Sequence, residues 1–267
     1  PLADDTIRAL LPQDKIAEHR QRALNPEHPV IRGTSANPDT YFQSREATNP
    51  WYDAVYDHVE TAMNDFAAAT GRQYKPFEFY GHPQAERVIV IMGSAIGTCE
   101  EVVDELLSRG EKVGVLKVRL YRPFSAAHLL AALPESARAV AVLDRTKEPG
   151  ALAEPLYLDV MTALAEAFNR GERETLPRTI GGRYGLSSKE FGPECVLAIF
   201  HELQAAQPKP RFTVGIYDDV TNLSLPLGEN TLPSEAKLEA LFYGLGSDGS
   251  VSATKNNIKI IGNSTPW

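Results

Sequence analysis

Between residues 86 and 216, short apolar runs alternate with stretches in which apolar residues recur at helical spacing. The run Arg87–Met92 is almost wholly apolar, as expected for a strand covered on both faces. After it, Val102, Val103 and Leu106 lie on one stripe of a predicted helix that ends at Gly110. The same alternation continues, with strands predicted at 112–120, 138–143, 178–182 and 211–216, and helices at 125–133, 154–168 and from Pro193 onward. This alternation predicts an α/β fold with a three-layer, mainly parallel sheet.

The residues before this region predict a helical N-terminal segment that prolines interrupt. One helix is expected at 14–23, and Asn49-Pro50 begins a longer one. The longer helix carries four apolar residues that should form one buried stripe: Val55, Val59, Met63 and Phe66. Within the α/β region, Thr98 followed by Glu101 has the pattern of a capping box.

The character of the chain changes again after residue 210. Residues 218–237 have the composition of a loop, and the apolar segment Ala240–Tyr243 leads into a glycine-rich loop, Gly244–Gly249. Helix-compatible residues follow at 250–257, and Ile258–Gly262 is predicted to be a strand that runs into a glycine turn. A strand at this position would lack a covering helix, and the chain starts with Pro1, so we expect a segment cut from a longer polypeptide.

Composition excludes several classes of function. A formal net charge of -8 leaves no basic stripe for nucleic acid, and no run of about 18 apolar residues could cross a membrane. The two cysteines, Cys99 and Cys195, are far apart in apolar helical patterns, which argues against a disulfide framework and a thiolate metal site and favours a reducing, cytoplasmic setting. The six histidines show no metal-ligand spacing, and no G-x-S-x-G motif occurs. The sequence therefore predicts no catalytic and no metal-binding residues.

Four groups of residues remain as candidates for binding. Gly244–Gly249 matches G-x-G-x-x-G, which suits either a phosphate at a helix N-terminus or a structural turn. Gly93–Gly97 follows a strand, and close packing of strand on helix is the favoured reason for its small residues. Asp144–Gly150 alternates in charge after a strand, which favours interdomain salt bridges at Asp144 and Arg145 over an acid/base site. The fourth group, Lys117, Arg119 and Arg122, must find partners or extend to the rim of the sheet.

Five strings, in order along the chain, resemble pyruvate:ferredoxin (flavodoxin) oxidoreductases. They are Asn25–Asp39 with its Asn-Pro-Glu-His-Pro and Arg-Gly-Thr motifs, Lys117–Phe124, Leu143–Gly150, Gly182–Phe191 and Phe242–Gly249. The resemblance implies an enzyme that decarboxylates pyruvate oxidatively with coenzyme A to acetyl-CoA and reduces ferredoxin or flavodoxin. It further implies thiamine diphosphate, Mg²⁺ and 4Fe-4S clusters in an intact, usually dimeric enzyme, all held by residues outside these 267.

The resemblance also implies a division of this chain. Residues 1–82 would end the first, pyruvate- and thiamine-binding domain, 83–210 would form a domain like the C-terminal domain of transketolase, and 211–267 would be a linker and the start of a third domain. Because the family's third domain is associated with coenzyme A, Thr254 and Lys255 are the expected contacts with it, although relatives often have Asn-Lys there. The expected role is mainly that of a scaffold. The alternatives are a freestanding module that binds a nucleotide or coenzyme A, and a noncatalytic assembly subunit.

Overall fold

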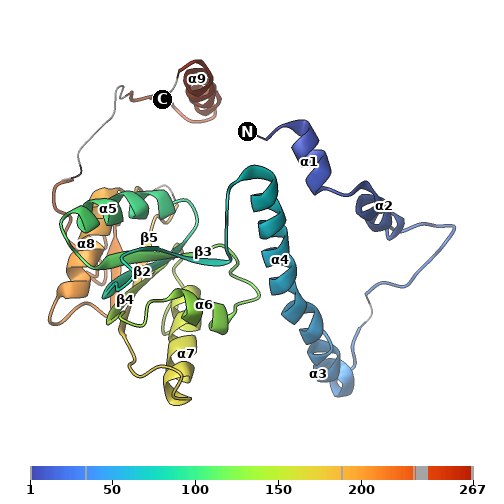
Figure 1. Cartoon of the computed structure of the whole chain (residues 1–267), viewed down its shortest axis with the longest axis horizontal. Coiled ribbons are helices and arrows are strands. Elements are labelled where there is room, and N and C mark those ends of the chain that lie inside the picture. Colours follow the sequence, from blue (N-terminus) through green and yellow to red (C-terminus); the bar gives the residue numbers. More distant parts are fainter. Residues whose placement is uncertain (1, 34, 188, 231, 233–239, 266–267) are drawn as a thin grey trace. The chain divides into compact units, whose positions relative to one another are not determined.

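The apolar runs between residues 77 and 214 form six strands of one sheet (Figure 1). The computed structural model describes residues 2–33, 35–187, 189–230, 232 and 240–265. The strands are β1 (Phe77–Gly81), β2 (Arg87–Met92), β3 (Val113–Val118), β4 (Ala139–Asp144), β5 (Arg178–Tyr184) and β6 (Arg211–Val214). Their order across the sheet is β1-β3-β2-β4-β5-β6, and only the pair β1–β3 is antiparallel. The predicted, mainly parallel sheet is confirmed.

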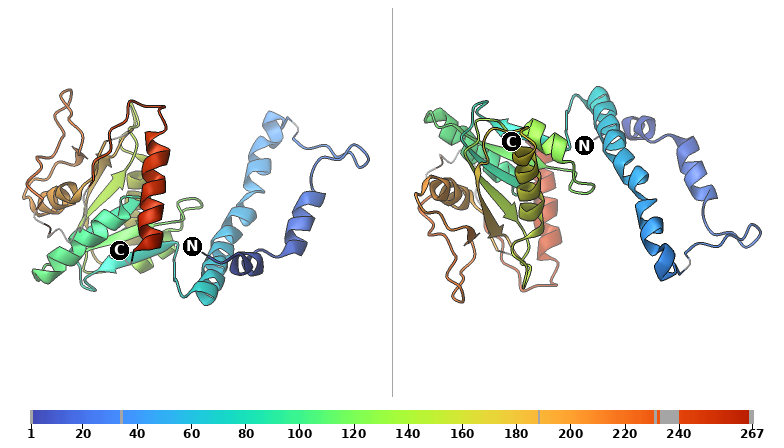
Figure 2. Two further views of the ribbon diagram at one scale, coloured as in Figure 1. Left: turned by 90° about the horizontal axis from the view of Figure 1, so that it is seen from above. Right: turned by 90° about the horizontal axis from the view of Figure 1, so that it is seen from below.

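Helices cover both faces of this sheet, as the views of Figures 1 and 2 show. Helices α5 and α8 contact each other and lie on one face, whereas α6 and α7 contact each other and lie on the other. The helices in chain order are α1 (Asp4–Leu10), α2 (Gln13–Gln21), α3 (Pro38–Glu46), α4 (Asn49–Thr70), α5 (Ile96–Ser108), α6 (Ala126–Ala132), α7 (Pro155–Asn169), α8 (Pro193–Gln204) and α9 (Ser250–Ser264). The three-layer α/β architecture is therefore also confirmed.

The core explains why β2 has no polar residue in its interior. Val88, Ile89, Val90 and Ile91 are all 0% exposed, because helices cover successive side chains on opposite faces. Val88 and Val90 belong to the cluster that also contains residues of α6 and α7, such as Leu129. Burial on both faces thus gives the continuous apolar run that the sequence displays.

The end of α5 follows the expected glycine rule, but its beginning does not. Gly110 has φ +81°, and the amides of Gly110 and Glu111 donate to the carbonyls of Leu107 (2.9 Å) and Leu106 (3.0 Å), which closes the helix. The helix begins at Ile96 with Ala95 as its N-cap, and no side chain caps it. The capping box predicted for Thr98 and Glu101 is wrong because the helix begins before both residues.

Two other elements of the structure differ from the prediction. β1 was not predicted, and it pairs with β3 from Phe77 opposite Val118 to Gly81 opposite Gly114. The strand predicted at Ile258–Gly262 is wrong, because these residues lie within α9. Their apolar positions, Ile258, Ile260 and Ile261, are too few to distinguish a strand from a helix by periodicity.

Helix α4 contacts the α/β region through an aromatic residue that the pattern did not single out. Tyr56 is 6% exposed, and its ring stacks on the ring of His128 of α6 with 3.8 Å between the centroids. The four residues of the predicted stripe, from Val55 to Phe66, are only partly buried. The helix is confirmed, whereas its burial is less complete than predicted.

The chain divides into two compact units, residues 1–231 and 232–267. The second unit contains the glycine-rich loop and α9. This boundary lies within the predicted linker, and the predicted limits 1–82, 83–210 and 211–267 stay predictions.

Candidate functional site

In open parallel sheets, ligands bind outside the carboxyl ends of the strands, where the strand order reverses. Here that place is the end of β2, because β3 lies on one side of it and β4 on the other. The hydroxyl of Tyr184, at the end of β5, donates to the carbonyl of Met92, at the end of β2, over 2.9 Å. Tyr184 is only 3% exposed, and burial raises its pKa to about 12. The end of β2 is therefore bridged by a side chain of the protein itself.

Asp144, at the carboxyl end of β4, performs a structural task. One carboxylate oxygen accepts from the amide of Leu156 (2.9 Å) and the other from that of Tyr157 (3.1 Å), in the first turn of α7. The residue is 3% exposed, and burial raises its pKa although both amides act in the opposite direction. The expected interdomain salt bridge is wrong for Asp144, because its carboxylate faces the start of α7 in its own domain.

Arg145, the next residue, is held against the loop that follows β5. Its Nε donates to the carbonyl of Gly185 (2.7 Å) and its Nη2 to that of Ser187 (3.3 Å). The side chain uses carbonyls instead of carboxylates and stays exposed. Its contact with another domain stays a prediction.

The sequence did not reveal a buried ion pair at this edge of the sheet. Arg183 Nε donates to Glu154 Oε1 over 2.6 Å, and the two residues are 9% and 2% exposed. The available signal was Arg183 directly after the strand predicted at 178–182, because a buried arginine requires a partner. The pair connects β5 to the residue before α7 and leaves neither charge free for a ligand.

The charges at the end of β3 found partners, as the sequence predicted. Lys117 is 3% exposed, and its Nζ donates to Glu78 (2.5 Å) on β1 and to Glu100 (2.8 Å) on α5. Arg119 also pairs with Glu78, and Arg122 pairs with Asp159 over 2.8 Å.

This cluster affects the ionisation of its shared carboxylate. Burial acts to raise the pKa of Glu78, but Lys117 and Arg119 together hold it below its ordinary value. The cluster is therefore a neutralised connection between β1, β3 and α5, with no group poised to exchange a proton.

The small residues after β2 have a different cause from the one expected. Gly93 has φ +90°, a conformation that other residues rarely adopt. A Cβ atom built on Gly93 or on Gly97 would meet no atom within 4 Å among the described residues. The prediction that these two glycines allow close packing of strand on helix is therefore wrong. At Gly93, the positive φ explains why a glycine is present.

The glycine-rich loop does not have the setting of a dinucleotide site. Residues 240–243 before it are neither helix nor strand, whereas that fingerprint requires a preceding strand. The carboxylate of Asp248 accepts from the amides of Leu245 (2.7 Å) and Ser250 (3.0 Å). Hydrogen bonds from Ser250 and Leu245 lower the pKa of Asp248 to about 2. A carboxylate of the loop thus occupies two amides that a phosphate would use.

The two residues expected to contact coenzyme A lie in the second turn of α9. The hydroxyl of Thr254 donates to the carbonyl of Ser250 over 2.8 Å, and Lys255 is exposed. Neither has a contact that tests the assignment.

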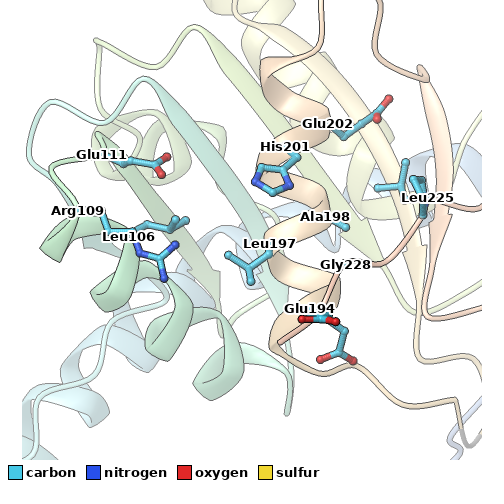
Figure 3. A pocket seen from close by; sticks show the side chains of 12 residues that line it. Leu106, Arg109, Glu111, Glu194, Leu197, Ala198, His201, Glu202, Leu225 and Gly228 are labelled. Atoms are coloured by element: carbon cyan, nitrogen blue, oxygen red, sulfur yellow. The ribbon is translucent and has the colours of Figure 1, made fainter. Parts of the chain in front are cut away.

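A groove of about 440 Å³ lies between α5 and α8 (Figure 3). Leu106 of α5 and Leu197 of α8 contribute apolar surface, and several charged residues surround them. Two of these charges are in ion pairs, Glu111 with Arg87 and Arg109 with Glu105, and Glu202 accepts from the amide of Lys209. Because its cationic and acidic side chains are largely engaged within the protein, the groove carries no assignment of a ligand.

Two further absences apply to the described part of the chain. No group of three or more His, Cys, Asp and Glu side chains there could hold a metal ion. None of the helices described is both long and apolar enough to cross a membrane. Cys99 and Cys195 are both buried, and burial raises the pKa of each thiol, to about 12 for Cys99.

Two family models match the chain in succession. The model described as "Pyruvate flavodoxin/ferredoxin oxidoreductase, thiamine diP-bdg" matches residues 1–64, and "Pyruvate:ferredoxin oxidoreductase core domain II" matches residues 85–185. The "Probable pyruvate-flavodoxin oxidoreductase" of Escherichia coli (strain K12) is 88% identical to the chain over all 267 residues. The chain belongs to the pyruvate:ferredoxin (flavodoxin) oxidoreductase family. The resemblance identified from the five sequence strings is thereby confirmed.

Other members of this family align over nearly the whole chain. The pyruvate-flavodoxin oxidoreductase of Rhodospirillum rubrum is 56% identical over 98% of it, and the pyruvate:ferredoxin oxidoreductase of Moorella thermoacetica 55% identical over 98%. The chain spans less than a quarter of each relative: 23% of the Escherichia coli protein and 22% of the other two. The chain thus corresponds to one part of a multidomain oxidoreductase, within which the first match concerns a thiamine diphosphate-binding domain.

Proposed function

We propose that this chain is mainly a scaffold within an enzyme that oxidatively decarboxylates pyruvate with coenzyme A to acetyl-CoA. The observation that supports a scaffold is the condition of the sheet's carboxyl edge. Tyr184 bridges the end of β2, Asp144 caps α7, and Glu154 neutralises Arg183. These four side chains hold strands and helices together, and none of them is free to act on a substrate.

The proposed reaction needs groups that other parts of the polypeptide would supply. Thiamine diphosphate with Mg²⁺ would form the reactive centre, 4Fe-4S clusters would carry the electrons, and ferredoxin or flavodoxin would accept them. The identity to named oxidoreductases over the whole chain supports this proposal. The intact enzyme would be a cytoplasmic homodimer, and the rigid α/β unit would position its neighbouring domains.

The isolated 267-residue chain is expected to show no turnover with pyruvate, coenzyme A, thiamine diphosphate and flavodoxin. The full-length protein is expected to reduce flavodoxin only when both pyruvate and coenzyme A are present. Flavodoxin reduction followed by absorbance measures both. Turnover by the isolated chain would overturn the scaffold role, and reduction by the full-length protein without pyruvate would overturn the proposed reaction.

A coenzyme A contact on α9 is the second part of the proposal. Lys255 is exposed one turn beyond the glycine-rich loop, where a lysine can meet a phosphate as a point charge. Thr254 keeps its hydroxyl oxygen as an acceptor although its proton is used on Ser250.

In the full-length enzyme, Lys255→Ala is expected to raise KM for coenzyme A by about tenfold with kcat little changed, since a lost charged hydrogen bond weakens ground-state binding. Steady-state kinetics with varied coenzyme A measure the two constants. Lys259→Ala, one turn farther along α9, serves as the matched control and should leave KM unchanged. Equal KM values for both variants and the parent would reject the contact. If the isolated chain bound coenzyme A tightly in calorimetry, the freestanding module would be favoured instead.

A further inference from the structure

A cavity of about 980 Å³ lies at the amino ends of β4 and β5, the edge of the sheet opposite the one described above. Arg138 precedes β4, Pro177 precedes β5, and Arg173 comes from the turn that follows α7. The turn is well defined, because the amides of Gly171 and Glu172 donate to the carbonyls of Phe168 (3.0 Å) and Ala167 (2.9 Å). The backbone therefore holds Arg173 at a fixed place in the wall of the cavity.

The guanidinium of Arg173 is buried but only partly satisfied. The residue is 8% exposed, and its Nη2 donates to the carbonyls of Pro134 (2.8 Å) and Glu135 (3.4 Å). Its Nε is inaccessible to solvent and has no acceptor among the described residues. Its Nη1 makes no hydrogen bond within the described chain either, and it is not among the inaccessible unpaired atoms, so it reaches the open side. Three of the five N–H groups are thus unused.

The charge of Arg173 also lacks a counter-ion. No carboxylate oxygen of the described residues lies within 4.0 Å of its nitrogens, although Glu135, Glu172 and Glu174 line the same cavity, Glu172 being paired with Arg170. Burial lowers the pKa of Arg173, and the more distant charge of Glu135 acts only in the opposite direction. A buried cation without a paired anion is costly, and Arg138 adds a second cation without an ion pair in the described chain.

We propose that this cavity binds an oxyanion, a phosphate or carboxylate group, on the guanidinium of Arg173. The two N–H groups of Nη1 would donate to the oxygens of such a group, because Nε is inaccessible to solvent and Nη2 is used on two carbonyls. The ligand would supply the missing counter-charge, with Arg138 as a second cation at the mouth. The source is either a small anion in solution or an acidic side chain of another part of the polypeptide, and both use the same chemistry.

Inorganic phosphate is the probe, titrated into the 267-residue chain at constant ionic strength and followed by calorimetry. Arg173→Met is expected to weaken phosphate binding by about 10- to 100-fold, because hydrogen bonds to a charged group are lost. Arg109→Gln removes an arginine that lies elsewhere, directly after α5, and should leave the affinity unchanged. Absence of phosphate binding by the parent, or equal binding by Arg173→Met, would overturn the proposal.

Arg173 also donates hydrogen bonds to two carbonyls, so Arg173→Met could weaken the fold as well as the binding. A second variant that keeps these bonds separates the two effects. Glu135→Gln keeps both backbone bonds and removes the carboxylate whose charge acts on the pKa of Arg173, and it is expected to tighten phosphate binding by about two- to fivefold. Unchanged or weaker binding in Glu135→Gln would contradict the assignment. Repeating the titration on the full-length protein distinguishes the sources: continued binding indicates a free anion. Loss of binding there, with a lower Tm for Arg173→Met than for the parent, indicates an acidic side chain in the cavity.

Discussion

Asp144→Ala is expected to lower the free energy of unfolding by about 2–4 kcal/mol, because two buried amides lose their acceptors. Both oxygens of the carboxylate are used, on Leu156 and on Tyr157, and the site is 3% exposed. Water therefore has little access to replace the lost carboxylate oxygens as acceptors. Urea denaturation followed by circular dichroism measures the change, with the midpoint and the slope compared separately.

Two variants calibrate this result. Asp144→Asn keeps one acceptor oxygen and should cost less than Asp144→Ala. Glu101→Ala removes an exposed carboxylate from α5 and should change the free energy of unfolding by less than about 0.5 kcal/mol. If Asp144→Ala costs no more than Glu101→Ala, Asp144 does not stabilise the start of α7.

The same carboxyl group gives stability a pH dependence of known sign. Burial raises the pKa of Asp144 above its ordinary value, so the native state binds this proton more tightly than the unfolded state does. The stability that this proton contributes is fully present below the pKa of Asp144 in the unfolded state. It is lost as the pH rises through the higher pKa of the native state. The stability of the parent relative to Asp144→Asn should therefore increase as the pH falls through this window. A flat difference would contradict the raised pKa.

Lys117→Met is expected to lower the free energy of unfolding by about 2–3 kcal/mol and to loosen the edge of the sheet. The substitution leaves Glu78 and Glu100 beside each other without their shared cation. Because these glutamates are 28% and 32% exposed, water screens them, and the cost should stay below that of a fully buried pair. Denaturation measures the loss, and hydrogen exchange should be faster for the amides of β1.

Lys112→Met is the matched control for this prediction. Lys112 is 47% exposed, and its amine lies 3.9 Å from Glu86, so its removal should cost less than about 0.5 kcal/mol. Adding Glu78→Gln to Lys117→Met should restore part of the loss, since the like charges are then no longer adjacent. Equal stability of Lys117→Met and Lys112→Met would show that the buried cluster stabilises nothing.

The regular part of the fold could be predicted because its signals are local. The strands β2, β3 and β4 are largely apolar runs, and each helix from α5 to α8 has its stripe within a short window. β1 escaped prediction because Phe77–Gly81 is short and carries Glu78, so it becomes a strand only by pairing with β3, more than thirty residues later. Tertiary pairing decided its structure, and no local pattern does so.

In the candidate site, the sequence revealed which residues need a partner but not which residues those partners are. The charges of Asp144 and Lys117 could be singled out because each lies at or beside an apolar run. Their partners could not, since they lie 12 and 39 residues away along the chain. The prediction for Asp144 was wrong for this reason: its partner is the first turn of a helix in its own domain, and that turn carries no charged residue to reveal it.

The strand order has a consequence for synthesis of the chain on the ribosome. β1 and β2 follow each other with only residues 82–86 between them, yet they are not neighbours, because β3 lies between them. They cannot form a hairpin that persists, so the apolar residues of β2 stay without their final partner until Val118 has been translated and has left the exit tunnel. During this interval, the nascent segment is the part most exposed to mispairing and to capture by chaperones.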